Sequence, residues 1–221
     1  MWITLAMALF AAEDAWLKIV FQTVPLGQTM FLFGCFGVVG FLSWALIQRQ
    51  NPFHADMVRP VMLVRFGFEI TGRLFFFLAI ALSTLSAATV ILQATPILVV
   101  AVAAVLFKEK VGPRRWGAIG LGFLGVLIVV RPGADAFDPM SVLAVIGMIG
   151  FAGRDLTSRM APTTLGMVAL GLTGFFALSV AGLAYGVWSG EHWAWPTPHA
   201  ILQIIGITGL GMAAYIALMR A

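Results

Sequence analysis

The feature that constrains this chain most is a series of apolar segments, each long enough to cross a lipid bilayer. A transmembrane helix needs roughly 20 consecutive apolar residues, because the hydrocarbon core is about 30 Å thick. Eight such segments can be counted, at about residues 2–21, 28–48, 61–82, 84–107, 115–131, 140–160, 164–188 and 200–219. The sequence therefore predicts an all-α polytopic membrane protein with about eight transmembrane helices.

Composition supports this prediction and excludes other classes. Of the 221 residues, 61% are hydrophobic and 10% are charged, whereas soluble domains carry about 25% charged residues. Cys35 is the only cysteine, and His54, His192 and His199 lie in predicted loops without a ligand-like cluster. We therefore expect no disulfide framework, no metal site and no cofactor. The expected partners are the lipid bilayer and a small-molecule substrate.

The charges of the predicted loops indicate an orientation. Basic residues gather in the connections after the second and fourth segments and at the ends of the sixth and eighth: Arg49, Arg59, Lys108, Lys110, Arg114, Arg115, Arg159 and Arg220. Glu109 is in one of these loops, and the opposite side carries Arg131 with Asp135, Asp138 and Glu191. Because basic loops stay in the cytoplasm, we expect a multi-pass protein of the bacterial inner membrane with a cytoplasmic N-terminus. This distribution explains the net charge of +4 without a nucleic-acid partner.

Two segments carry similar short stretches of charged residues where apolar residues are expected. The first segment contains the stretch AEDAWLK and the sixth contains GRDLTSR. In each stretch an aspartate precedes a basic residue by four positions, Asp14 with Lys18 and Asp155 with Arg159, and this spacing places both on one helix face. Charge inside a bilayer costs at least about 2.5 kcal/mol per group, so such residues usually face a protein interior and mark a transport pathway.

The two charged stretches belong to a longer pattern. Asp155 follows Asp14 by 141 residues, and Leu26-Gly27 recurs as Leu165-Gly166. Since five segments separate the two copies, the copies enter the membrane from opposite sides. This is an inverted-topology repeat, which in transporters places the substrate site near the midplane between the two units. We expect a first unit at 1–133 with five transmembrane helices and a second at 134–221 with three.

The fourth and fifth segments carry a set of motifs in a characteristic order. They are ILQATPIL, the Lys-Glu-Lys of 108–110, the RRWG of 114–117 and a glycine-rich span that ends in VVRPG. This set closely resembles the first repeat of EamA-type transporters in the drug/metabolite transporter superfamily. The resemblance implies a ten-helix plan of two inverted five-helix units and a secondary transporter for a small metabolite. No second copy of QATP or of the glycine ladder follows, so the second repeat is expected to be truncated.

Glu13 is the sharpest candidate for substrate contact or coupling. A carboxylic acid in a low-dielectric environment can exchange a proton near neutral pH. Glu13 also looks similar to the first-helix glutamate that related small multidrug-resistance proteins use for proton coupling. The alternative is a structural ion pair with Arg154, at the pseudo-symmetric position of the sixth segment. Asp14 and Asp155 are either substrate contacts or members of orientation-fixing pairs, with Lys18 and Arg159 respectively.

Two further sets of residues point to the interior of the bundle. Arg65, Glu69 and Arg73 are spaced four apart in the third segment and form one charged stripe. We expect Arg65 to reach the cytoplasmic interface and Arg73 to face the cavity, where it would attract an anionic or polar substrate. Pro96 is expected to kink the fourth segment, placing Gln93 on a cavity; a kink that serves packing alone is the alternative.

The function that these features favour is transport of a small metabolite by alternating access, with proton coupling at Glu13 as an option. The QATP stretch and the Arg154-Asp155 pair resemble riboflavin importers most, and amino-acid-like substrates are the other candidates. The alternatives are a structural or assembly subunit, an inactive fragment, or an intramembrane enzyme, although no zincin, serine-elbow or phosphate-loop motif occurs. Small residues suit either close helix packing or a homodimer: Gly34, Gly37, Gly40, Ala118, Gly122 and Gly125.

Overall fold

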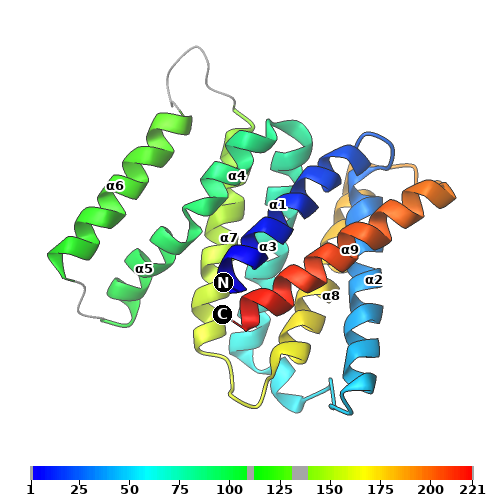
Figure 1. Cartoon of the computed structure of the whole chain (residues 1–221), viewed down its shortest axis with the longest axis horizontal. Helices are drawn as coiled ribbons and strands as arrows, with labels where there is room; N and C mark the ends of the chain where they lie inside the picture. Colours follow the sequence, from blue (N-terminus) through cyan, green and yellow to red (C-terminus); the bar gives the residue numbers. More distant parts are fainter. Residues whose placement is uncertain (1, 109–111, 131–138, 221) are drawn as a thin grey trace.

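The computed structural model describes residues 2–108, 112–130 and 139–220 of the chain, and all regular elements in these ranges are helices. The helices are α1 Trp2–Val20, α2 Leu26–Ile47, α3 Pro60–Leu82, α4 Leu85–Gln93, α5 Thr95–Leu106, α6 Pro113–Val130, α7 Ser141–Arg159, α8 Met167–Ser189 and α9 Pro198–Met219, with a short 3-10 helix η1 Ala55–Val58 (Figure 1). Helices α4 and α5 together occupy the fourth predicted segment, and each of the other α-helices named here occupies one segment. The predicted all-α fold of about eight membrane segments is therefore confirmed.

Most of these helices suit a lipid bilayer by length and composition. Among the described residues, five spans are long and apolar enough to cross a membrane: 26–47, 85–106, 141–159, 167–189 and 198–218. Helices α1 and α3 have similar lengths, but each carries three charged residues. These two charged helices supply most of the candidate functional residues, and the packing described below buries their charges against other helices.

Proline, threonine and glycine fix where several helices begin and end. Pro60 and Pro198 are the first residues of α3 and α9, where the missing N–H of proline removes no helical hydrogen bond. Thr197 caps α9, since its hydroxyl accepts a hydrogen bond from the Ala200 N–H at 3.2 Å. Gly190 ends α8 with φ of 68°, a left-handed conformation that glycine adopts without steric cost.

The helices of the bundle pack in symmetric pairs. Helix α1 packs along α9, α2 along α8 and α3 along α7, while α3 also contacts α8 and α2 contacts α9. If α1 is exchanged with α7, α2 with α8 and α3 with α9, the same helix pairs are obtained again. Helices α4, α5 and α6 lie to one side of the bundle, where α6 packs mainly against α4 and α5 (Figure 1).

Glycines allow the closest of these helix crossings. A Cβ atom at Gly34 of α2 would lie 2.5 Å from the backbone nitrogen of Ser179 in α8, and one at Gly150 of α7 would lie 2.6 Å from the Cα of Gly72 in α3. Backbones this close leave no room for any side chain. The small face around Gly34 therefore serves packing within the bundle, and a homodimer stays a prediction.

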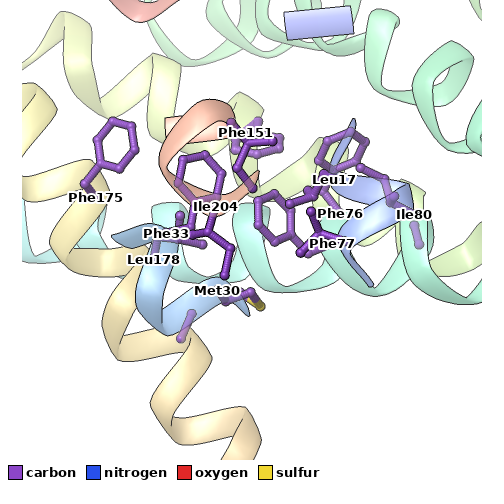
Figure 2. Close-up of a cluster of buried hydrophobic side chains, with 14 of the residues drawn as sticks. Leu17, Met30, Phe33, Phe76, Phe77, Ile80, Phe151, Phe175, Leu178 and Ile204 are labelled. Atoms are coloured by element: carbon purple, nitrogen blue, oxygen red, sulfur yellow. The ribbon is translucent and has the colours of Figure 1, made fainter. Parts of the chain in front are cut away.

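A core rich in aromatic side chains runs through the bundle. Phe33 stacks against Phe77 with ring centroids 6.1 Å apart and meets Phe175 edge-on at 5.6 Å. Leu17 and Met30 are fully buried in the same cluster, and Figure 2 shows these side chains converging from several helices. The candidate site adjoins this core, because Arg73 lies over Phe175 and Arg154 lies over Phe151.

Candidate functional site

Glu69 of α3 is the centre of a buried group of charges. Its side chain is 2% exposed, and three guanidinium groups bind its carboxylate. Arg65 and Arg73 of the same helix approach it at 3.5 and 3.1 Å, and Arg154 of α7 approaches at 3.5 Å. The structure thus brings the predicted stripe of α3 together and adds an arginine from the other half of the chain.

Arg154 joins this group to a second carboxylate. Its Nη2 and Nε atoms lie 2.8 and 2.9 Å from Oδ1 of Asp155, and its guanidinium carbon lies 4.7 Å from the centroid of the Phe151 ring. In the described part of the chain, its ion pairs go to Glu69 and Asp155, and none goes to Glu13. The alternative of a Glu13–Arg154 pair is therefore wrong, because α7 packs against α3 while α1 packs against α9. The pairing of Asp155 with Arg159, an exposed residue at the end of α7, stays a prediction.

Arg65 is buried, so the expectation that it reaches the cytoplasmic interface is wrong. Its side chain is 3% exposed. Its Nε donates to Ser158 of α7 at 2.9 Å and its Nη1 donates to Thr173 of α8 at 3.3 Å, in addition to the Glu69 contact. Each of the three guanidinium nitrogens thus has an acceptor. Sequence reasoning missed both hydroxyl residues, although Ser158 lies inside the GRDLTSR stretch.

Lys18 of α1 has partners other than the predicted one. Its ammonium group donates to the backbone carbonyls of Ile80, of Ala81 at 3.4 Å and of Ser83 at 2.8 Å. These carbonyls belong to the last turn of α3, where helical carbonyls lack intrahelical partners and a cation is favourable. Among the ion pairs found between described residues, none joins Lys18 to Asp14. Lys18 thus fixes α1 to the end of α3, and the predicted pairing is wrong.

Glu13 of α1 is buried and forms no ion pair with any of the residues that the structure describes. Its side chain is 3% exposed, and Oε2 has no hydrogen-bond partner among the described residues. This oxygen lies against Gly211 of α9, where a Cβ atom would be 2.9 Å away. Asp14 and Arg73 are the charged groups that act on Glu13 electrostatically. A buried polar group without a hydrogen-bond partner costs about 1–3 kcal/mol in stability. A ligand that donates a hydrogen bond to this carboxyl group would remove that cost.

Tyr215 of α9 is a site residue that sequence reasoning missed. Its hydroxyl is buried and, within the part of the chain that the structure describes, makes no hydrogen bond. The hydroxyl interacts electrostatically with Arg65, Glu69 and Arg154, while the ring meets Phe41 of α2 edge-on at 5.7 Å. The only available sign was a lone polar aromatic residue in an otherwise apolar segment.

Comparison with known proteins identifies the family. Residues 1–131 match the profile of the EamA-like transporter family. The chain belongs to this family. It is 22% identical over 216 residues to an S-adenosylmethionine uptake transporter of Rickettsia bellii, an alignment that covers 94% of this chain and 71% of the relative. It is also 31% identical over 96 residues to a riboflavin transporter of Vibrio cholerae, covering 41% of this chain and 32% of the relative. No solved structure gives a significant match.

The predicted kink of this EamA-like protein lies outside the buried charges. The helix is interrupted between α4 and α5, with Pro96 in the first turn of α5. Pro96 lacks the N–H that would bind the Leu92 carbonyl in a continuous helix, and the Thr95 hydroxyl donates to that carbonyl at 2.5 Å instead. Gln93 is exposed at the end of α4. The structure therefore contains the kink but does not bring Gln93 to the charged residues.

Seven charged site residues among those described form one cluster. It consists of Glu13, Asp14, Arg65, Glu69, Arg73, Arg154 and Asp155. Arg65, Arg73 and Arg154 pair with two carboxylates, those of Glu69 and Asp155. These five side chains together carry one net positive charge. Glu13 and Asp14 face it from α1. A site with both unpaired acidic groups and an excess of arginine can bind a ligand that carries charges of both signs.

Proposed function

We propose that this EamA-like protein is a secondary transporter that moves a small metabolite across the bacterial inner membrane by alternating access. The charged cluster among α1, α3 and α7, in which Glu13, Arg65 and Glu69 are buried, is the observation that carries the proposal. Ionisable groups inside a membrane are costly and usually line the route of a substrate or ion. The family and the transporters it resembles support movement of a small molecule rather than catalysis.

An inverted repeat is the second part of the proposal. The symmetric helix pairs support two related units, 1–133 and 134–221, because a two-fold axis between such units exchanges the pairs in this way. The boundary between them lies outside the described residues, as do five residues of the orientation argument: Glu109, Lys110, Arg131, Asp135 and Asp138. A cytoplasmic N-terminus remains part of the proposal.

S-adenosylmethionine is the first candidate substrate. The relatives with that named substrate align over 94% of this chain. The molecule carries an ammonium group, a sulfonium group and a carboxylate, so its charges suit a cluster with acids and arginines side by side. Riboflavin is the second candidate, because riboflavin transporters match parts of the chain, one with 31% identity.

Uptake into proteoliposomes tests the proposal. Purified protein is compared with protein-free liposomes for uptake of labelled S-adenosylmethionine and riboflavin, with and without a pH gradient. We expect saturable uptake of one of them. Glu13→Gln belongs in the same assay, since unchanged gradient-driven uptake would remove its role in proton coupling. If no compound of the panel is taken up, the assembly-subunit alternative gains support; conversion of the compound would favour an enzyme.

A further inference from the structure

Two polar atoms on the α1–α9 side of the charged cluster are buried without partners. Across the described residues only three side-chain atoms share this property, and two of them are Glu13 Oε2 and Tyr215 Oη. Glu13 Oε2 lies over Gly211, and Tyr215 follows Gly211 by four residues in α9, which places both on one helix face. Side chains four residues apart on a helix lie one turn from each other, so the Tyr215 position is one turn of α9 from the place where the Glu13 carboxyl group packs.

Arg73 presents a positive charge to the same region. Its guanidinium group lies over the Phe175 ring, which meets the rings of Phe33 and Phe41. Phe33 in turn lies at Gly211, beside Glu13, and Phe41 meets the Tyr215 ring. Its Nε is bound to Glu69 at 3.1 Å, and its guanidinium carbon lies 5.6 Å from the centroid of the Phe175 ring. The side chain is 12% exposed, so it is held in place from two sides but is not fully enclosed. Its terminal nitrogens are suited to a carboxylate, which binds guanidinium groups in bidentate fashion.

We infer that Glu13, Tyr215 and Arg73 form a subsite for the α-amino-acid group of a substrate. The Glu13 carboxylate and the Tyr215 oxygen accept from the ammonium group, and the Arg73 guanidinium donates to the carboxylate. This inference rests on the proposed transport function, and it narrows the substrate class to metabolites that carry a free α-ammonium and α-carboxylate group. Asp14, which also faces Arg73 electrostatically, adds negative charge near the ammonium position.

Binding measurements on the detergent-purified chain test this subsite apart from transport. S-adenosylmethionine and S-adenosylhomocysteine carry the amino-acid group, and 5′-methylthioadenosine has the same nucleoside without it. We expect Tyr215→Phe to weaken binding of the first two about tenfold or more, as loss of a hydrogen bond to a charged group does. Glu13→Gln should act in the same direction. Tyr185→Phe, at the only other tyrosine, is the matched control and should bind all three compounds as the wild type does.

The outcomes separate the two proposals. Equal weakening of all three compounds by Tyr215→Phe, or no weakening of any, overturns the subsite. Binding that depends on Tyr215 and Glu13, without uptake into proteoliposomes, overturns the transport function and supports the subsite as a receptor-like site. If the wild type binds none of the three compounds, the assignment of an amino-acid group is wrong.

A second inference comes from contacts at the two ends of the bundle. At one end, Glu191 in the α8–α9 connection accepts from the Gly27 N–H of α2 at 3.1 Å and from the indole N–H of Trp193 at 3.0 Å. Gln28 donates to the Ala194 carbonyl at 2.6 Å. Since Gly27 is in the first turn of α2, its N–H lacks a helical partner and favours a carboxylate. A cavity of about 230 Å³ lies beside these residues.

The other end has a matching contact. Asp56 of η1, in the connection from α2 to α3, accepts from the Thr164 hydroxyl just before α8 and pairs with Arg59 at 2.7 Å. Thr164 precedes Gly166 by two residues, and Gly166 is the counterpart of Gly27 in the repeat pattern. The two contacts are therefore equivalent in the repeat. Glu191 follows α8 and binds the first turn of α2, while Asp56 follows α2 and binds the residues just before α8.

We further infer that these two contacts are latches, one for each end of the transport route, and that each must open during a transport cycle. A substrate can drive a change between two states only if it binds them with different affinities. In a transport cycle one latch would open while the other stays closed, and the two would alternate.

Paired cysteines in a Cys35→Ser background test the latches. One variant carries Gln28→Cys with Ala194→Cys, and the other carries Asp56→Cys with Thr164→Cys. After each pair is joined by a short thiol-specific cross-linker and verified by mass spectrometry, we expect uptake to stop in both variants and to return after the linker is cleaved by reductant. Uptake at the uncross-linked rate while either linker is in place would overturn the latch at that end.

Discussion

Replacing Glu69 with glutamine tests whether its carboxylate holds the charged cluster together. Glu69→Gln keeps the shape of the side chain and removes the charge shared by Arg65, Arg73 and Arg154, at 3.5, 3.1 and 3.5 Å. Arg154 would keep Asp155, and Arg65 would keep two hydroxyl groups. Arg73 would lose its ionic partner. Breaking a buried ion pair from one side costs about 3–5 kcal/mol, which is a factor of about 10² to 10³·⁵ in the folding equilibrium.

The assay is unfolding in detergent, followed by denaturant titration or by loss of the monodisperse peak on heating. Glu13→Gln is the matched control, because Glu13 is a similarly buried acid at 3% exposure and has no ion pair within the described ranges. We expect Glu69→Gln to unfold at much lower denaturant or temperature, and Glu13→Gln to unfold like the wild type. If the two variants were equally stable, the view that Glu69 is structural while Glu13 is free for substrate would be refuted.

Three further substitutions test individual contacts by the same unfolding assay. Lys18→Met removes the donors to three carbonyls at the end of α3 and should cost about 1–3 kcal/mol. Thr95→Val removes the hydroxyl bound to the carbonyl at the helix break and should cost about 1 kcal/mol, whereas Thr71→Val, at an exposed hydroxyl, should cost less. Gly150→Ala places a Cβ 2.6 Å from backbone of α3 and should cost about 1–3 kcal/mol. Gly67→Ala, where no atom outside the adjacent residues and local helix backbone lies within 4 Å of the new Cβ, should be tolerated; equal effects of the paired variants would contradict these assignments.

The helices could be predicted from sequence because their causes are local. Apolar length, with prolines such as Pro60 and Pro198 at the helix starts, determines where the spans lie. The contacts between Glu69 and the arginines of α3 also follow from a spacing of four residues.

Contacts between helices could not be predicted in this way. The bond of Arg154 to Glu69 depends on α7 packing against α3, and the carbonyl partners of Lys18 depend on where α3 ends beside α1. Tyr215 belongs to the site only because α9 packs along α1, at the far end of the chain. Such pairings are decided by the packing of whole helix faces, and no spacing within one helix encodes them.

Thiol labelling inside the charged cluster tests the central claim most directly. Thr173, which binds Arg65, is replaced by cysteine in a Cys35→Ser background, and the protein in proteoliposomes is treated with a membrane-impermeant thiol reagent. If the cluster between the two halves is the transport route, Thr173→Cys is labelled from either side of the membrane and saturating S-adenosylmethionine slows the labelling. No labelling from either side, or labelling that neither S-adenosylmethionine nor riboflavin changes, would contradict the account.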